Sequence, residues 1–173
     1  MKSAAEAVEA GIVAGRAGVR VVGRGSFRSA SALRHFALAA IEQGTRDVVC
    51  DLTDCLSMDS TFIGVLAQIG LDLKRQEGGT LTLWGLSPKL DNGLRTLGLD
   101  RLAALRAAEA GSSAMAGAPL RPLDLGAGAT DRTFLDAHVA LADLSEENRE
   151  RFRGVIQCLT AEQDRAAPPE DTP

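Results

Sequence analysis

The 173-residue chain has few aromatic residues, no excess of basic residues and no long apolar run. Aromatic side chains make up 3% of the sequence, with one Trp and no Tyr. Proteins that bind single-stranded nucleic acid stack bases on aromatic rings, and phosphate backbones require a basic surface, whereas the net charge here is −4. A membrane-spanning helix needs roughly 20 consecutive apolar residues. The sequence therefore indicates neither a nucleic-acid partner nor membrane insertion.

Cysteine and histidine are scarce as well. Cys50, Cys55 and Cys158 lack the spacing of metal ligands, and Cys50 lies in a strand pattern, where a buried free thiol is expected. The two histidines, His35 and His138, fall in separate predicted helices, each without a second ligand at helical spacing. We therefore expect no metal site and no cofactor. The N-terminus carries an acid early and lacks the apolar segment of a signal peptide, so a cytoplasmic location is expected.

The apolar residues that are present follow strand and helix spacing in alternation. Short β-rich runs predict a hairpin over residues 10–22 and strands at 47–52 and 80–84. Periodic apolar residues predict three helices, of which the first begins near Ser29 or Ser31, the second carries Phe62 through Leu73, and the third begins at Ser87. Between the hairpin and the first helix, Gly23-Arg24-Gly25-Ser26 is expected to form a turn. The order β-β-α-β-α-β-α predicts an α/β fold, in which helices pack on a sheet that contains parallel pairs.

The C-terminal third of the chain has a different composition. Residues 111–130 are rich in Gly, Ala and Pro and are expected to form a linker or loop. Residues 131–166 show two amphipathic helix patterns, and residues 167–173 are expected to be a disordered tail. The apolar stripe of this helical extension can pack on its own domain, form a homodimer or hold a partner helix.

A hydroxyl-bearing segment follows the strand at 47–52. Asp59-Ser60-Thr61 is expected at the first turn of the second helix, where unpaired N–H groups favour negative charge. A phosphate on Ser60 would be tolerated there, and it would change any surface that docks on the turn. In a purely structural role, Ser60 would instead cap the helix, in competition with Ser57 and Asp59.

Three acids lie near the same strand end. Asp51, Asp54 and Asp59 could together hold a magnesium ion, as in enzymes that handle phosphate. Alternatively, Asp51 and Asp54 border a loop, and Asp59 sits at a helix start that stabilises its charge. We favour the second interpretation.

The segment Asp59-Ser60-Thr61-Phe62-Ile63-Gly64-Val65-Leu66 resembles the signature of STAS domains, whose common form is Asp-Ser-Ser/Thr-Gly-Leu-Gly. The resemblance covers roughly residues 10–110 and is of the anti-sigma factor antagonist type. Phe62 stands where Gly is usual, and Gly23-Arg24-Gly25-Ser26 stands where the family often has Gly-Glu-Leu-Asp.

The resemblance implies a function and its residues. The residue that a partner kinase phosphorylates in such antagonists corresponds to Ser60, with Thr61 as the second choice. The implied protein is a non-enzymatic phosphoswitch of bacterial partner-switching type. It would bind an anti-sigma factor with serine kinase activity, and a phosphatase would act on it. The partner-binding surface would comprise Asp59, Ser60, Thr61, Phe62, Gly25 and Ser26.

The alternative function is an interaction subunit that is not phosphorylated, in a larger complex such as a lipid-transport ATPase. Phe62 favours this alternative, because an exposed aromatic side chain can anchor an interface. In either case residues 10–110 are expected to form the STAS-like domain, with a mixed sheet, and to fold without residues 131–173.

Overall fold

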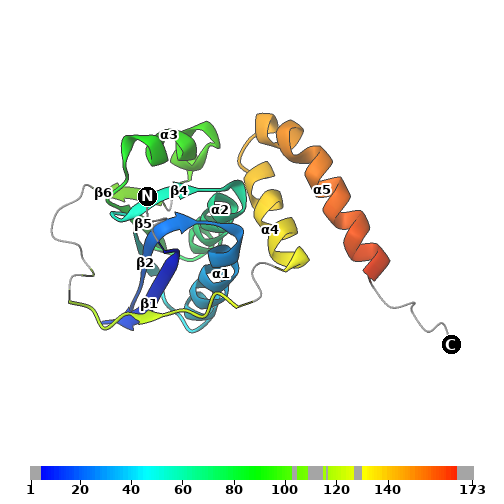
Figure 1. Ribbon diagram of the computed structural model, residues 1–173. Helices are drawn as coiled ribbons and strands as arrows, with labels where there is room; N and C mark the ends of the chain where they lie inside the picture. Colours follow the sequence, from blue (N-terminus) through cyan, green and yellow to red (C-terminus); the bar gives the residue numbers. More distant parts are fainter. Residues whose placement is uncertain (1–4, 103–104, 109–114, 116, 127–129, 167–173) are drawn as a thin grey trace.

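The computed structural model of the protein describes residues 5–102, 105–108, 115, 117–126 and 130–166 (Figure 1). Its strands are β1 (Ala7–Val13), β2 (Arg16–Gly25), β3 (Asp47–Asp51), β4 (Cys55–Met58), β5 (Thr80–Trp84), β6 (Leu105–Ala108) and β7 (Arg121–Pro122). Its helices are α1 (Phe27–Glu42), α2 (Ser60–Lys74), α3 (Pro88–Thr96), α4 (Asp131–Ala142) and α5 (Glu146–Ala166), with a 3-10 turn at Leu99–Arg101. The expected tail, 167–173, and part of the expected linker lie outside the described residues.

The strands form one mixed sheet, and the predicted α/β class is confirmed. The sheet order is β6-β5-β3-β2-β1-β7, and β4 pairs with the far end of β2. Strand β1 is antiparallel to both β2 and β7, whereas the β2–β3, β2–β4, β3–β5 and β5–β6 pairs are parallel. The β1–β2 hairpin turns at Ala14 and Gly15, which both adopt positive φ angles (50° and 77°). The hairpin and the strands at 47–52 and 80–84 therefore form where the sequence predicted them.

Helices α1, α2, α4 and α5 lie in successive layers against one face of the sheet. Helices α1 and α2 come first, α4 packs on α2, and α5 packs on α4 as the outermost element (Figure 1). Helix α2 is apolar almost all round, which is typical of a helix that is buried on two sides. Phe62, Leu66 and Ile69 are fully buried in the core. The C-terminal helical extension thus covers the side of α2 that faces away from the sheet.

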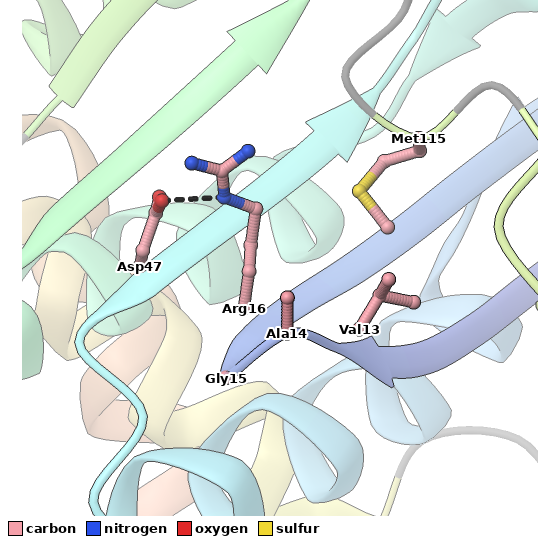
Figure 2. Close-up of a pocket in the computed structure, with 6 residues that line it drawn as sticks. All are labelled: Val13, Ala14, Gly15, Arg16, Asp47 and Met115. Atoms are coloured by element: carbon pink, nitrogen blue, oxygen red, sulfur yellow. Dashed lines mark hydrogen bonds and ion pairs between the residues drawn. The ribbon is translucent and has the colours of Figure 1, made fainter.

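The opposite face of the sheet is polar and carries ion pairs. Arg16 pairs with Asp47 and Arg20 pairs with Asp54, each at 2.6 Å. Met115 lies over β2, where a Cβ on Gly18 would approach its Cε within 1.8 Å. Figure 2 shows Met115 above the strand and the Arg16–Asp47 pair beside it. The hollow between them has a volume of about 290 Å³ and is lined by Val13, Ala14, Gly15, Arg16, Asp47 and Met115.

Three local predictions were wrong in detail. The expected turn at Gly23–Ser26 is the end of β2, because β4, which the sequence analysis missed, pairs with residues 23–25. Helix α1 begins at Phe27 with Ser26 as its N-cap, earlier than the expected Ser29 or Ser31. Ser29 completes a capping box instead, since its Oγ accepts a hydrogen bond from the Ser26 N–H (3.0 Å). The expected linker also contains β7, which pairs with β1.

The start of α5 is held to the rest of the molecule by a buried amide. Asn148 donates from Nδ2 to the carbonyl oxygens of Leu97 (2.8 Å) and Leu141 (2.9 Å). Further along the helix, Phe152 is half-buried, but Val155 is 43% exposed. The predicted apolar stripe therefore packs within the chain at Phe152 and reaches the surface at Val155.

The contact between α2 and α4 is testable at one glycine. A Cβ at Gly64 would lie 2.4 Å from the Ala137 carbonyl oxygen, so Gly64→Ala should destabilise the fold by about 1–3 kcal/mol. Gly154→Ala is the matched control, because Gly154 lies in α5 with open space around it, and it should stabilise by up to about 1 kcal/mol. Urea denaturation measures both. If both variants changed the free energy of unfolding by the same amount, α4 would not pack on α2 in solution.

The independence of the STAS-like region, residues 10–110, stays a prediction. We expect a chain that ends at residue 130 to unfold cooperatively, because the sheet and the helices on it are then complete. It should be less stable than the full chain, since removal of α4 bares one side of α2. Urea denaturation followed by circular dichroism would test this, and the absence of a cooperative transition would contradict it.

Candidate functional site

The pairing of β2 with β4 brings the two predicted partner-binding segments together. Gly25 at the end of β2 lies opposite Met58 at the end of β4. The Asp59 N–H then donates to the Gly25 carbonyl oxygen at 3.0 Å. Ser26 and Asp59, the N-caps of α1 and α2, therefore lie side by side, so both helices begin at the same edge of the sheet.

One carboxylate holds both helix starts. Asp59 accepts a hydrogen bond from the Phe62 N–H at Oδ1 (2.9 Å) and another from the Phe27 N–H at Oδ2 (2.8 Å). Its negative charge thus lies at the positive ends of two helix dipoles, where it is stabilised. Ser26 completes the arrangement, since its Oγ accepts from the Arg28 N–H (3.1 Å) and donates to Glu6 (2.5 Å).

Phe62 is buried, contrary to the expectation of an exposed aromatic anchor. Its exposed fraction is 0%, and a Cβ on Gly25 would lie 2.9 Å from its ring. The missing side chain of Gly25 therefore makes room for the ring, which explains how an aromatic residue fits in the first turn of α2. Thr61, the second candidate phosphoacceptor, is also buried, with 4% exposed.

Ser60 is free of the capping role, and its hydroxyl contacts a histidine. Because Asp59 is the N-cap, Ser60 is the first residue of α2. Its Oγ lies 3.3 Å from Nε2 of His138 on α4. Nδ1 of His138 lies 2.8 Å from the Phe134 carbonyl oxygen, which can only accept, so Nδ1 carries the hydrogen. In the neutral ring Nε2 is then an acceptor, and the Ser60 hydroxyl donates to it.

His138 lies where three helices meet. Its side chain is 6% exposed, and its ring packs edge-on against Phe152 of α5 at a centroid distance of 5.4 Å. A second aromatic contact joins Phe134 of α4 to Phe27 of α1, with ring centroids 5.8 Å apart. The sequence analysis missed this role of His138, because Ser60 and His138 are 78 positions apart and no local pattern links them.

The three acids near the strand end have separate structural roles. Asp51 accepts a hydrogen bond from the Thr53 N–H (3.0 Å), Asp54 pairs with Arg20, and Asp59 caps the two helices. Within the residues that the structure describes, no group of three or more His, Cys, Asp or Glu side chains is arranged to hold a metal ion. Asp51 and Asp54 thus border the loop after β3, and Asp59 lies at the start of α2.

The family model described as "Mlab, STAS domain" matches residues 11–107, which is more than half of the chain. The chain belongs to this STAS domain family. The match includes α2 and its Asp-Ser-Thr start, and it ends before α4 and α5. In this STAS protein, His138 therefore comes from outside the matched region.

Three solved structures similar to this STAS protein, two of SpoIIAA and one of a Thermotoga maritima protein, are each 20% identical to it in sequence. SpoIIAA in its unphosphorylated form has a TM-score of 0.46, with 53% of this chain and 82% of that chain covered. The phosphorylated form of the Bacillus cell fate determinant SpoIIAA has a TM-score of 0.48, with coverage of 60% and 91%. A Thermotoga maritima protein described as an anti-sigma factor antagonist has a TM-score of 0.47, with coverage of 57% and 84%.

No curated protein matches the chain in sequence. Among the described helices, none is both long and apolar enough to cross a bilayer.

The double capping role of Asp59 predicts an unusually large cost for its removal. Asp59→Ala should lower the free energy of unfolding by about 2–4 kcal/mol, because two helix N–H groups lose a charged acceptor. Asp59→Asn should lower it less, because one oxygen acceptor remains. Ser87→Ala is the control, since Ser87 accepts only the Leu90 N–H at the start of α3 and should cost about 1 kcal/mol. Chemical denaturation of the three variants gives the comparison. If Asp59→Ala costs no more than Ser87→Ala, Asp59 does not hold both helices.

Proposed function

We propose that this STAS protein is a regulatory binding module of the bacterial cytoplasm. Phosphorylation of Ser60 would control its binding to a partner protein. The observation that carries the proposal is the division of roles at the start of α2. Asp59 caps the helix, so the Ser60 hydroxyl is not needed for capping. Ser60 is half-buried, whereas Thr61 is buried, which makes Ser60 the preferred acceptor and Thr61 the fallback.

The partners follow from the resemblance to anti-sigma factor antagonists. We propose that the module binds an anti-sigma factor with serine kinase activity and that a phosphatase reverses the modification. A phosphate adds a charge of about −1.5 to −2 and is tolerated at a helix N-terminus. It would still change the docking surface, which includes Asp59 and the 44% exposed Phe27, whereas Gly25 and Ser26 are buried. A loss of only about 2.8 kcal/mol would weaken partner binding a hundredfold.

A catalytic role is the less favoured use of the Ser60–His138 pair. The pair resembles a nucleophile and its base. However, Nδ1 of His138 bonds to the backbone carbonyl of Phe134, whereas the corresponding nitrogen of a catalytic triad is held by a carboxylate. His138 is also buried against Phe152. These contacts support a binding module without enzymatic activity.

The second candidate function is an interaction subunit that is not phosphorylated, in a complex such as a lipid-transport ATPase. One observation favours it. The Ser60 hydroxyl is hydrogen-bonded to the buried His138, and a kinase would have to break this contact. The exposed Phe27 and Leu56, which is 62% exposed on β4, would then supply the apolar part of the interface. Val155 on α5 offers surface for a homodimer or a partner helix in either case.

Incubation with the cognate kinase and ATP, followed by mass spectrometry, tests the proposal. Phosphate should appear on Ser60 and be lost in Ser60→Ala, while the control Ser57→Ala on β4 should still be modified. Ser60→Ala should bind the partner without release. Ser60→Asp should bind more weakly than the wild type, and this weakening should be partial, because Asp carries less charge than a phosphate. If neither Ser60 nor Thr61 is phosphorylated and both Ser60 variants bind like the wild type, the unphosphorylated subunit becomes the better explanation.

A further inference from the structure

The hydroxyl hydrogen of Ser60 is the donor in the contact between α2 and His138. The Nδ1 hydrogen of His138 is used by the Phe134 carbonyl, so Nε2 can only accept in the neutral ring. His138 in turn packs on Phe152, so the same ring connects α2 with both C-terminal helices. Any change that removes the Ser60 donor therefore acts directly on the contact of α4 with α2 and, through the His138 ring, on the packing of α5 against α4.

Phosphorylation removes this donor. In the transfer from ATP, the Ser60 Oγ–H bond is lost, an Oγ–P bond forms, the bond between the β- and γ-phosphates breaks, ADP leaves and the proton passes to the kinase or to solvent. Every oxygen of the phosphoserine that can face Nε2 is then an acceptor when the phosphate is dianionic. Two acceptors 3.3 Å apart cannot form a hydrogen bond, and the buried Nε2 of His138 is left without a donor.

We propose that phosphorylation of Ser60 releases the α4–α5 pair from α2, an inference that rests on Ser60 being the acceptor proposed above. The other contacts that hold α4 to α1 and α2 do not involve Ser60. Arg34 of α1 pairs with Asp136 of α4 at 2.7 Å, and Gly64 of α2 lies against Ala137. Asp59, next to Ser60, already carries a negative charge there, so the phosphate would add its charge beside an existing one, at the point where Ser60 contacts His138 of α4.

The release would change which surface of the protein a partner meets. Helix α4 lies against the side of α2 that carries Gly64, where the absence of a side chain lets the two helices approach closely. Once α4 moves away, this side of α2 is open to another helix. Phosphorylation would thus both add charge at the start of α2 and uncover a face that α4 occupies in the unmodified protein.

Hydrogen exchange of the full chain, followed by mass spectrometry, tests the release without a kinase. Ser60→Asp replaces the donor by a carboxylate, and amide exchange in α4 and α5 should become at least tenfold faster, which corresponds to about 1.4 kcal/mol. Exchange in β1–β3 should stay unchanged. Ser57→Asp adds the same charge on β4, outside the Ser60–His138 hydrogen bond, and should leave α4 and α5 as they are in the wild type.

A double variant distinguishes loss of the donor from a general effect of charge. In Ser60→Asp with His138→Gln, the glutamine amide can donate to the carboxylate, so the slow exchange of α4 and α5 should return. Ser60→Ala removes the donor without adding charge and should also accelerate exchange in α4 and α5, though less strongly. It keeps the test informative if Ser60→Asp folds poorly.

Three results would overturn the proposal. Unchanged or slower exchange of α4 and α5 in Ser60→Asp would show that the helices stay docked. Faster exchange spread equally over the sheet would show a general loss of stability. Equal acceleration by Ser57→Asp would show that charge alone is responsible. Since none of these measurements uses a kinase, their failure is separate from a failure of Ser60 to be phosphorylated.

Discussion

Helix α2 is packed between the sheet and α4, and the position of Ser60 depends on this burial on two sides. The sheet holds one side through core residues such as Leu66 and Ile69, and α4 holds the other where Ala137 lies against Gly64. A helix held in this way has little freedom to rotate or slide, because interiors are close-packed. The first residue of α2 is therefore presented at a defined place, with its hydroxyl against His138.

Around Ser60, the size or the hydrogen bonding of one residue is accommodated by a neighbouring residue. A bulky Phe62 in the first turn of α2 is accommodated because Gly25 on the neighbouring strand has no side chain. Asp59 can leave Ser60 free because one carboxylate satisfies N–H groups of both α1 and α2. The departure of this chain from the common STAS signature at Phe62 is thus matched by a second departure at the end of β2, where Gly25 stands in place of the bulkier residue that the family often has.

The C-terminal helices give this STAS domain a feature that the matched region, residues 11–107, does not contain. His138 links the start of α2 to α4 by a hydrogen bond and to α5 by its contact with Phe152. Asn148 ties the start of α5 to the end of α4 and to the end of the α3 segment. The extension is therefore joined to the domain at the site that we propose is modified. A chemical change at Ser60 would alter the hydrogen bond to α4 and, through His138, the packing of α5.

Apart from β4, the sequence alone determined the order of strands and helices between residues 10 and 98, because apolar periodicity and capping residues are local signals. The Asp-Ser-Thr pattern at the start of α2 also identified the Ser60 hydroxyl as the candidate phosphoacceptor. The tertiary structure decided the β2–β4 pairing, the burial of Phe62 against Gly25 and the contact of Ser60 with His138. Each of these joins residues far apart in the chain, and no local pattern encodes which distant side chain will fill a given space. For the same reason, the face on which α4 and α5 would pack was settled only by the fold.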